Sequence, residues 1–209
     1  VHLNFGQKIL RILKVLKKFS TTEPTCAPLQ LKANGQQNLK QNKKSKKFVY
    51  LISPNKIKDD NFYSNLALIL SLGKVSFFQL RLKNETNQNK LIIGKKIKKI
   101  CKKYKVKFLI NDDPLLAKKI NADGCHLGQK DMDLIKARKI LKNKIIGITC
   151  HNSINLAKRA IDAGADYLAF GAFYSSKTKI VKYKANLTIL KSVKKITSLP
   201  IVAIGGIKL

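Results

Sequence analysis

The fold is decided by residues 106–131, VKFLINDDPLLAKKINADGCHLGQKD. Two short runs in this stretch, residues 106–111 and 124–127, are mostly apolar and have the length of strands. Between them, residues 114–120 have the apolar spacing of a helix. Strands that are apolar on both faces pair in parallel when a helix covers the crossover between them. The stretch therefore predicts one unit of a parallel α/β sheet.

The same alternation continues on both sides of this unit. Short β-branched or aromatic runs predict seven strands, at residues 48–53, 75–81, 106–111, 124–127, 145–149, 167–170 and 201–204. Longer segments with helical spacing predict helices near residues 61–72, 88–104, 114–120, 134–141, 154–163 and 187–196. Strands that alternate with helices in this way form either an open doubly wound sheet or a barrel.

The residues that follow the predicted strands distinguish these two architectures. Polar residues or glycines end nearly every strand, namely Arg81, Asn111, His126, Thr149, Gly171 and Gly205. A barrel collects its active site from many such loops, whereas a dinucleotide-binding sheet carries a Gly-x-Gly-x-x-Gly turn after its first strand. Residues 53–55, Ser-Pro-Asn, are not such a turn. The sequence therefore predicts an α/β protein with a TIM (β/α)₈ barrel.

The barrel is expected to occupy residues 48–209. Because the sequence ends at Leu209, directly after the seventh predicted strand, we expect a barrel that is truncated there and C-terminally incomplete. Residues 1–47 are expected to form a basic, partly disordered N-terminal extension, since residues 20–47 lack clear periodicity. A basic amphipathic pattern at residues 7–19 leaves a membrane-surface helix or a targeting segment as the alternative for this extension.

The composition is that of a folded and strongly basic chain. It has 209 residues, 44% of them hydrophobic, and a formal net charge of +32. Only four of its 43 basic residues are arginine, and lysines fall on the solvent side of a helical pattern. Proteins that read nucleic acid usually add arginine forks and exposed aromatic residues. We therefore expect a solvated lysine surface and no nucleic-acid partner.

Apolar runs and cysteines bear on location. No apolar run approaches the roughly 18 residues that a membrane span requires, so no membrane span is expected. The four cysteines, Cys26, Cys101, Cys125 and Cys150, form no Cys-x-x-Cys pair and have no zinc-ligand spacing. They are expected to be reduced and mostly buried thiols, which favours a cytoplasmic location.

Acidic residues are scarce and concentrated in one part of the sequence. Five of the eleven fall between Asp112 and Asp133. Such a concentration indicates either chance at two helix N-termini, where aspartate is favoured, or a cation site. The residue pattern alone leaves both explanations open.

Six segments occur in the order and at about the spacing of one enzyme family. They are residues 50–54, 79–83, 110–113, 124–131, 171–179 and 203–207. Through them, residues 48–209 resemble the thiamine-phosphate synthase family, to which a thiazole tautomerase is related. The resemblance implies a transferase of thiamine biosynthesis, which joins a hydroxymethylpyrimidine diphosphate to a thiazole phosphate and releases pyrophosphate.

The resemblance also implies a Mg²⁺ cofactor, because Asp112 and Asp131 match the metal ligands of the family. An oxygen-ligated cation suits a pyrophosphate leaving group, whose charge must be neutralised. The alternative role for both residues is helix N-capping, since each precedes a predicted helix. The neighbouring Asp113 is predicted to start a helix instead of binding metal.

Three cationic side chains match the catalytic contacts that the family makes with the diphosphate, namely Arg81, Lys83 and Lys179. Arg81 and Lys83 are two positions apart, so they lie on one side of an extended backbone and can meet one diphosphate. Arginine adds a planar, bidentate contact with phosphate, which makes Arg81 the stronger of the two predictions.

The remaining substrate contacts that the resemblance implies are uncharged. Gln79 and Asn111 can read a pyrimidine edge, because an amide donates and accepts hydrogen bonds together. Thr149 keeps a hydroxyl group where the family usually has serine. The loop after the sixth strand and the turn after the seventh would bind the thiazole phosphate through Ser176, Thr178 and Gly206.

Two alternative functions stay open. A thiazole tautomerase would use a histidine for proton transfer, and His151 lies near the position of that catalytic residue. A non-catalytic basic barrel would instead bind nucleic acid or anionic surfaces through its lysines. The mechanism implied for the synthase is dissociative and needs no side-chain nucleophile, so His126 is at least as readily a hydrogen-bonded barrel residue as an acid or base. Small-molecule substrates are the expected partners, and a homo-oligomer is a further option.

Overall fold

Strands and helices alternate throughout the computed structural model, which describes residues 48–174 and 183–207. The strands are β1 Val49–Ile52, β2 Val75–Leu80, β3 Lys107–Asn111, β4 Gly124–Leu127, β5 Ile145–His151, β6 Tyr167–Phe170 and β7 Ile201–Ala203. The helices are α2 Asn61–Ser71, α3 Asn87–Lys103, α4 Pro114–Ile120, α5 Leu134–Leu141, α6 Ile154–Asp162 and α7 Thr188–Lys194. Each bound lies within two residues of the prediction. The predicted extension at residues 1–47 lies outside the described residues.

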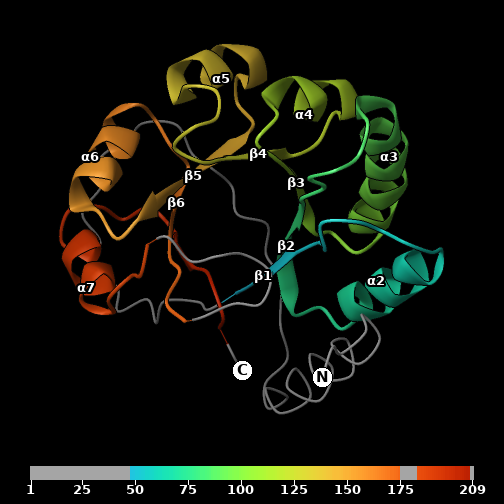
Figure 1. Ribbon diagram of the computed structural model, residues 1–209, viewed down its shortest axis with the longest axis horizontal. Helices are drawn as coiled ribbons and strands as arrows, with labels where there is room; N and C mark the ends of the chain where they lie inside the picture. Colours follow the sequence, from blue (N-terminus) through green and yellow to red (C-terminus); the bar gives the residue numbers. More distant parts are fainter. Residues whose placement is uncertain (1–47, 175–182, 208–209) are drawn as a thin grey trace, which may run out of the picture.

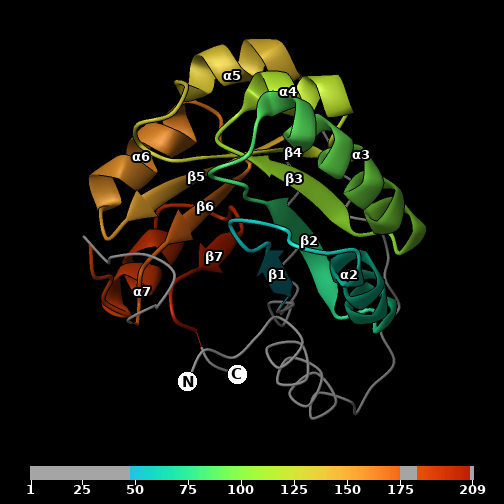
Figure 2. The ribbon, with the colours of Figure 1, turned by 45° about the vertical axis from the view of Figure 1, so that its right-hand side comes forward.

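The seven strands form one parallel sheet in chain order, from β1 to β7. The sheet curves around an axis, and the helices surround it in an arc (Figure 1). After rotation, the strands still line the inside of the curve and the helices its outside (Figure 2). β1 and β7 are the edges of this described sheet. The result is a nearly closed (β/α) barrel, which confirms the predicted fold class; truncation after the seventh strand stays a prediction.

Alternate strand residues face two different cores. Outward residues pack against the helices, and the largest of them include Phe78, Phe108, Ile146 and Leu168. Inward residues form a second and smaller cluster of Leu109, Tyr167, Ala169 and Val202, packed against Tyr50, Phe77, Ile145 and Ile204. This period of two is what a strand requires, because successive side chains point to opposite faces of the sheet.

Glycines make room for large groups inside the barrel. A Cβ atom at Gly147 would lie 1.8 Å from Cζ of Tyr167, so the neighbouring strand can admit this ring only where it has no side chain. At Gly124, a Cβ atom would lie 1.9 Å from the carbonyl oxygen of Ile145. Gly147 therefore gives the Tyr167 ring its space inside the barrel, and Gly124 lets the backbone of β5 approach closely.

The two ends of the barrel have different polar groups. The end where strands begin, here called the lower face, carries Arg138, which donates hydrogen bonds to three backbone carbonyls and to the Asp166 carboxylate at 2.7 Å. Asp166 also accepts from the Ile146 amide at 2.7 Å. This cluster joins the loops before β5 and β6. The end where strands finish is called the upper face, and it carries the predicted site.

Candidate active site

The predicted site residues that the structure describes gather at the upper face. Because all strands are parallel, their carboxyl ends meet at one end of the barrel. Gln79 lies in β2, Asn111 ends β3, and Thr149 lies in β5. Five more follow strand ends, namely Arg81, Lys83, Asp112, Asp131 and Gly206. The predicted residues Ser176, Thr178 and Lys179 lie outside the described residues, and their roles stay predictions.

A lysine and two carboxyl groups form the charged centre of the site. Lys83 Nζ lies 2.5 Å from Asp112 Oδ2, and the Asp112 and Asp131 carboxyl groups share a hydrogen bond. Asp131 Oδ2 also accepts from the Gly128 amide at 2.6 Å. Asp112 has a φ of 65°, in the left-handed region, which aspartate adopts more readily than most residues. Three loops that follow β2, β3 and β4 thus bring these groups together.

The two carboxyl groups have opposite pKa shifts. Burial raises the pKa of Asp112, but the hydrogen bonds from Lys83 and Asp131 outweigh burial and leave the pKa below its usual value. Burial, and then the adjoining Asp112 carboxylate, raise the pKa of Asp131. The physical reason is that two carboxylates in contact cannot both ionise without a positive charge between them. The two carboxyl groups therefore differ in how readily they ionise, with the pKa of Asp112 lowered and that of Asp131 raised.

The aspartates that cap helices are Asp113 and Asp133, and not Asp112 or Asp131. Asp113 caps α4 by accepting from the Leu116 amide at 2.9 Å, as predicted for a residue that starts a helix. Asp133 caps α5 through Oδ1. Asp112 and Asp131 cap neither helix, so the capping alternative for these two residues is wrong.

Arg81 and Lys83 are organised by a residue that the sequence did not single out. Arg81 Nη1 donates to the Asn55 side-chain oxygen, and the Lys83 amide donates to the Asn55 carbonyl at 3.3 Å. The Arg81 amide also donates to Ser53 Oγ at 2.8 Å. The loop after β1 thus holds the loop after β2. The one available signal was the Ser-Pro-Asn turn itself, which joins a predicted strand to a helix.

The amide and hydroxyl residues of the site are connected through the barrel interior. Gln79 Nε2 donates to Asn111 Oδ1 at 2.5 Å, and Tyr50 donates to Gln79 Oε1 at 3.1 Å. The two hydroxyl groups of Tyr50 and Tyr167 lie 2.8 Å apart. Neither tyrosine was predicted as a site residue. Both occupy inward strand positions, so the period of two together with a polar atom was the signal that could have found them.

His126 connects this arrangement to Thr149. Its Nδ1 lies 2.7 Å from the Tyr167 hydroxyl, and its Nε2 lies 2.8 Å from Thr149 Oγ1. Burial lowers the pKa of His126 to about 4, so the ring is neutral near pH 7. A buried ring with both nitrogens occupied is a hydrogen-bonded barrel residue, and not a free acid or base.

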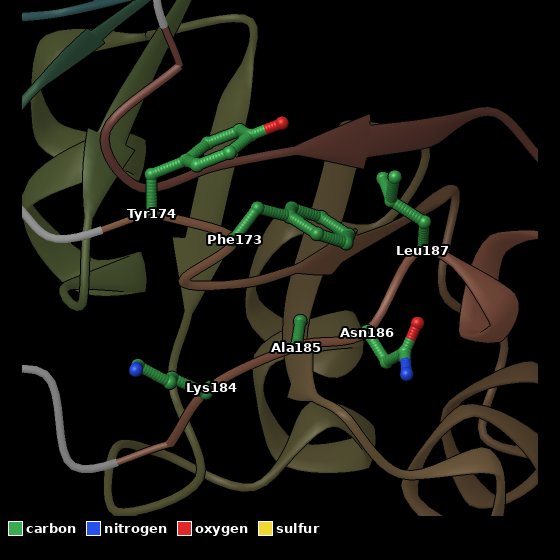
Figure 3. Close-up of a pocket in the computed structure, with 6 residues that line it drawn as sticks. All are labelled: Phe173, Tyr174, Lys184, Ala185, Asn186 and Leu187. Atoms are coloured by element: carbon green, nitrogen blue, oxygen red, sulfur yellow. The ribbon is translucent and has the colours of Figure 1, made fainter.

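Above β6 and β7, the backbone turns back on itself at two glycines. Gly205 and Gly206 have φ of 89° and 63°, and a Cβ atom at Gly205 would lie 2.3 Å from the Ala172 Cβ atom. Glycine is therefore required where this turn approaches Ala172. A shallow cavity of about 400 Å³ lies beside this turn, lined by Phe173, Tyr174, Lys184, Ala185, Asn186 and Leu187. Figure 3 shows the Phe173 ring near Ala185 and Leu187, while Lys184 points away from it.

His151 lies at the edge of this region. Its ring stacks on Tyr183, with 4.3 Å between ring centroids and 30° between the planes. The register of β5 and β6 shifts between Thr149 and His151, and His151 has a φ of 52°. The histidine that a tautomerase would need therefore packs on an aromatic ring beside the strand end.

Comparison with known proteins decides the family. A model of the thiamine monophosphate synthase family matches residues 49–209. The chain belongs to this family. It is 84% identical over 171 residues to a thiamine-phosphate synthase of Pelagibacter ubique, a match that covers 82% of this chain and 83% of that protein. A thiamine-phosphate synthase of Marinobacter nauticus is 43% identical over 161 residues, covering 76% of this chain and 72% of that protein.

A solved structure agrees with the family assignment. Thiamine phosphate pyrophosphorylase from Pyrococcus furiosus is similar with a TM-score of 0.65 and 30% identity, covering 77% of this chain and 75% of that chain. The predicted family, barrel fold and synthase function are therefore confirmed, and neither the tautomerase nor the non-catalytic barrel is favoured. Among the residues that the structure describes, no helix combines the length and the apolarity that crossing a bilayer demands.

Proposed function

We propose that this family member is a Mg²⁺-dependent transferase. It would join 4-amino-2-methyl-5-hydroxymethylpyrimidine diphosphate to a thiazole phosphate, giving thiamine phosphate and pyrophosphate. The observation that carries the proposal is the contact between Asp112 and Asp131, with Lys83 2.5 Å from Asp112. Two carboxyl groups that could bind a cation, next to a lysine, are suited to a substrate that carries a diphosphate group.

Asp112 and Asp131 would hold the metal. Within residues 48–174 and 183–207, no group of three or more His, Cys, Asp or Glu side chains is arranged to hold a metal ion. A site with two carboxylates fits Mg²⁺, which commonly takes one or two protein carboxylates and completes its shell with water and substrate phosphate. When bound, the ion would supply positive charge to the departing pyrophosphate.

The chain's own cations would bind the diphosphate from the other side. Lys83 is half-exposed, and its ammonium group has donors beyond the one that Asp112 accepts. Arg81, held by Asn55, would place its guanidinium group at the rim of the same face. Lys179 would add a third positive charge from the loop after β6. These cations lower the energy of the charge that develops on the leaving group.

The neutral residues would bind and orient the pyrimidine. Gln79 is buried and already bonded to Asn111, so it would hold the Asn111 amide in one orientation. Thr149 would offer its hydroxyl group across the pocket. Ser176, Thr178 and Gly206 would bind the thiazole phosphate. Holding two substrates in one geometry converts a bimolecular step into an effectively unimolecular one.

The state of His126 supports a mechanism that relies on charge and position. His126 is neutral near pH 7 and bonded through both ring nitrogens to protein hydroxyl groups, which suits a role in positioning. Departure of pyrophosphate followed by capture of the pyrimidine-methyl cation by the thiazole nitrogen needs no side-chain nucleophile. A cytoplasmic location is part of the proposal, supported by the buried free thiols of Cys101, Cys125 and Cys150. Assembly into a homo-oligomer stays a prediction.

Metal dependence and the roles of Asp112 and Asp131, here called the acid pair, can be tested together. Turnover of the purified full chain should be lost in EDTA and restored by Mg²⁺. Asp112→Ala should lower kcat by about a thousandfold, because an electrostatic contact to the developing charge is lost. Asp133→Ala is the matched control, since Asp133 caps α5 nearby, and its turnover should equal that of the parent chain. Full turnover in EDTA, or in Asp112→Ala, would contradict the metal assignment.

A further inference from the structure

One hydrogen-bond network crosses the barrel interior below the acid pair. It connects six side chains, each from a different strand: Asn111, Gln79, Tyr50, Tyr167, His126 and Thr149. Adjacent members are between 2.5 and 3.1 Å apart. Within the described residues, no buried side-chain nitrogen or oxygen lacks a hydrogen-bond partner. This set is called the interior network below.

The direction of every bond in the interior network follows from its first member. Tyr50 donates its only hydroxyl proton to Gln79, so its oxygen must accept from Tyr167. Tyr167 then has no proton left for His126 and accepts from Nδ1–H. A neutral imidazole with Nδ1 protonated has Nε2 as an acceptor, so Thr149 donates to it.

A second arrangement uses the same contacts and reverses every bond. If the oxygen and nitrogen of both amides exchanged places, Gln79 would donate to Tyr50 and each later bond would invert. His126 would then carry its proton on Nε2 and donate to Thr149. Each of these two arrangements needs a neutral ring, in which one nitrogen donates and the other accepts. Between these two arrangements, the tautomer of His126 shows which one is present.

The ends of the interior network are the two groups that the substrate would meet. In the arrangement found here, Asn111 uses its oxygen within the network and presents its N–H₂ group as a donor. Thr149 uses its proton within the network and presents only lone pairs. A flat heterocycle with an acceptor on one edge and a donor on another, such as an aminopyrimidine, complements this pair.

We propose that Tyr50, Tyr167 and His126 are positioning residues for the pyrimidine substrate. They act through Asn111 and Thr149, by fixing His126 as the Nδ1-protonated tautomer and so fixing the donor and acceptor ends of the interior network. The link to substrate rests on the proposed function. The tautomer itself is a property of the free protein and can be measured without turnover.

The tautomer is read by NMR of the full chain labelled with ¹⁵N-histidine. The chain has three histidines, so the His126 signals are those that disappear in His126→Asn. The expected result near pH 7 is a neutral ring with the proton on Nδ1. A proton on Nε2, or an imidazolium, would overturn the proposal even if the enzyme is fully active. Absence of product from the parent chain would instead count against the proposed function.

The positioning role is tested with Tyr167→Phe, which removes the acceptor of His126 Nδ1–H and the donor to Tyr50. Its kcat/KM for the pyrimidine diphosphate should fall about tenfold, as expected for loss of a buried hydrogen bond. The His126 signals should shift, and the KM for the thiazole phosphate should stay unchanged. Tyr104→Phe makes the same chemical change outside the interior network and should alter none of these.

A second variant tests the same role in case Tyr167→Phe folds poorly. Tyr50→Phe removes the proton that Gln79 accepts and should give the same selective loss. An unshifted His126 signal in both variants, or equal losses for the two substrates, would show that the tyrosines are merely structural.

Discussion

Aspartates lie on both faces of the barrel, but they are used in opposite ways. On the lower face, Asp166 has the Arg138 guanidinium and a backbone amide as donors, and Asp123 accepts from the Phe108 amide at 2.9 Å. On the upper face, Asp112 and Asp131 contact each other, and Lys83 pairs with Asp112. Opposite charges in contact stabilise each other, whereas two carboxyl groups in contact make it costly for both to ionise. The lower face therefore holds the barrel together, and the upper face is arranged for chemistry.

The largest expected effect separates the two faces by paired alanine variants. Asp131→Ala should lower kcat by about a thousandfold and change the free energy of unfolding by less than about 1 kcal/mol, because the cost of burying a carboxyl group beside Asp112 is removed and offsets the lost acceptor of the Gly128 amide. Asp166→Ala should lower the free energy of unfolding by about 2–3 kcal/mol, since Arg138 and the Ile146 amide lose their acceptor. Its turnover in the folded state should be unchanged.

Urea unfolding and steady-state kinetics on the same preparations check this pair. The contrast breaks if Asp131→Ala is the less stable of the two variants, or if Asp166→Ala loses turnover while it remains folded.

A smaller effect concerns pH. Burial lowers the pKa of His126 from 6.5 to about 4, so between these values the unfolded chain binds more protons than the folded one. Stability is therefore complete above about pH 6.5 and falls as the pH drops toward 4. At pH 5 the loss from this one residue should be about 2 kcal/mol.

The pH effect is checked by urea unfolding of the parent chain and of His126→Asn at pH 7 and pH 5. The aspartates titrate in both proteins, so the difference between the two slopes isolates His126. Equal slopes would mean that the ring takes up a proton in the folded state as easily as in the unfolded chain.

The smallest expected effect sharpens the comparison within the upper face itself. Asp113→Ala should lower the free energy of unfolding by about 1 kcal/mol, because the first turn of α4 loses its N-cap. Turnover of the folded protein should be unchanged, although Asp112 is the adjacent residue. Thermal unfolding and kinetics are the measurements. A large loss of turnover would show that Asp113 takes part in the site as well as in capping.

Much of the fold followed from residue pattern. Periods of two and of about four residues predicted every strand and helix that the structure describes, with small shifts such as the extension of β5 to His151. The family resemblance implied Gln79, Asn111, Lys83, Asp112 and Asp131 as site residues, and the structure places all five at the upper face. Asn55 and Tyr167 were missed, because their roles depend on what another strand places beside them. Tyr167 matters only because Gly147, twenty residues earlier, leaves space for its ring.

The sequence by itself determined the parallel α/β architecture, the face on which the site lies, and which residue types are present there. These depend on local periodicity and on the direction of parallel strands, which a linear pattern records. Only the tertiary structure decided which aspartates cap helices and which meet each other. It also brought the members of the interior network within hydrogen-bonding distance of one another. Such choices depend on distances of a few ångströms between side chains from different strands, and hydrogen bonding is set at that scale.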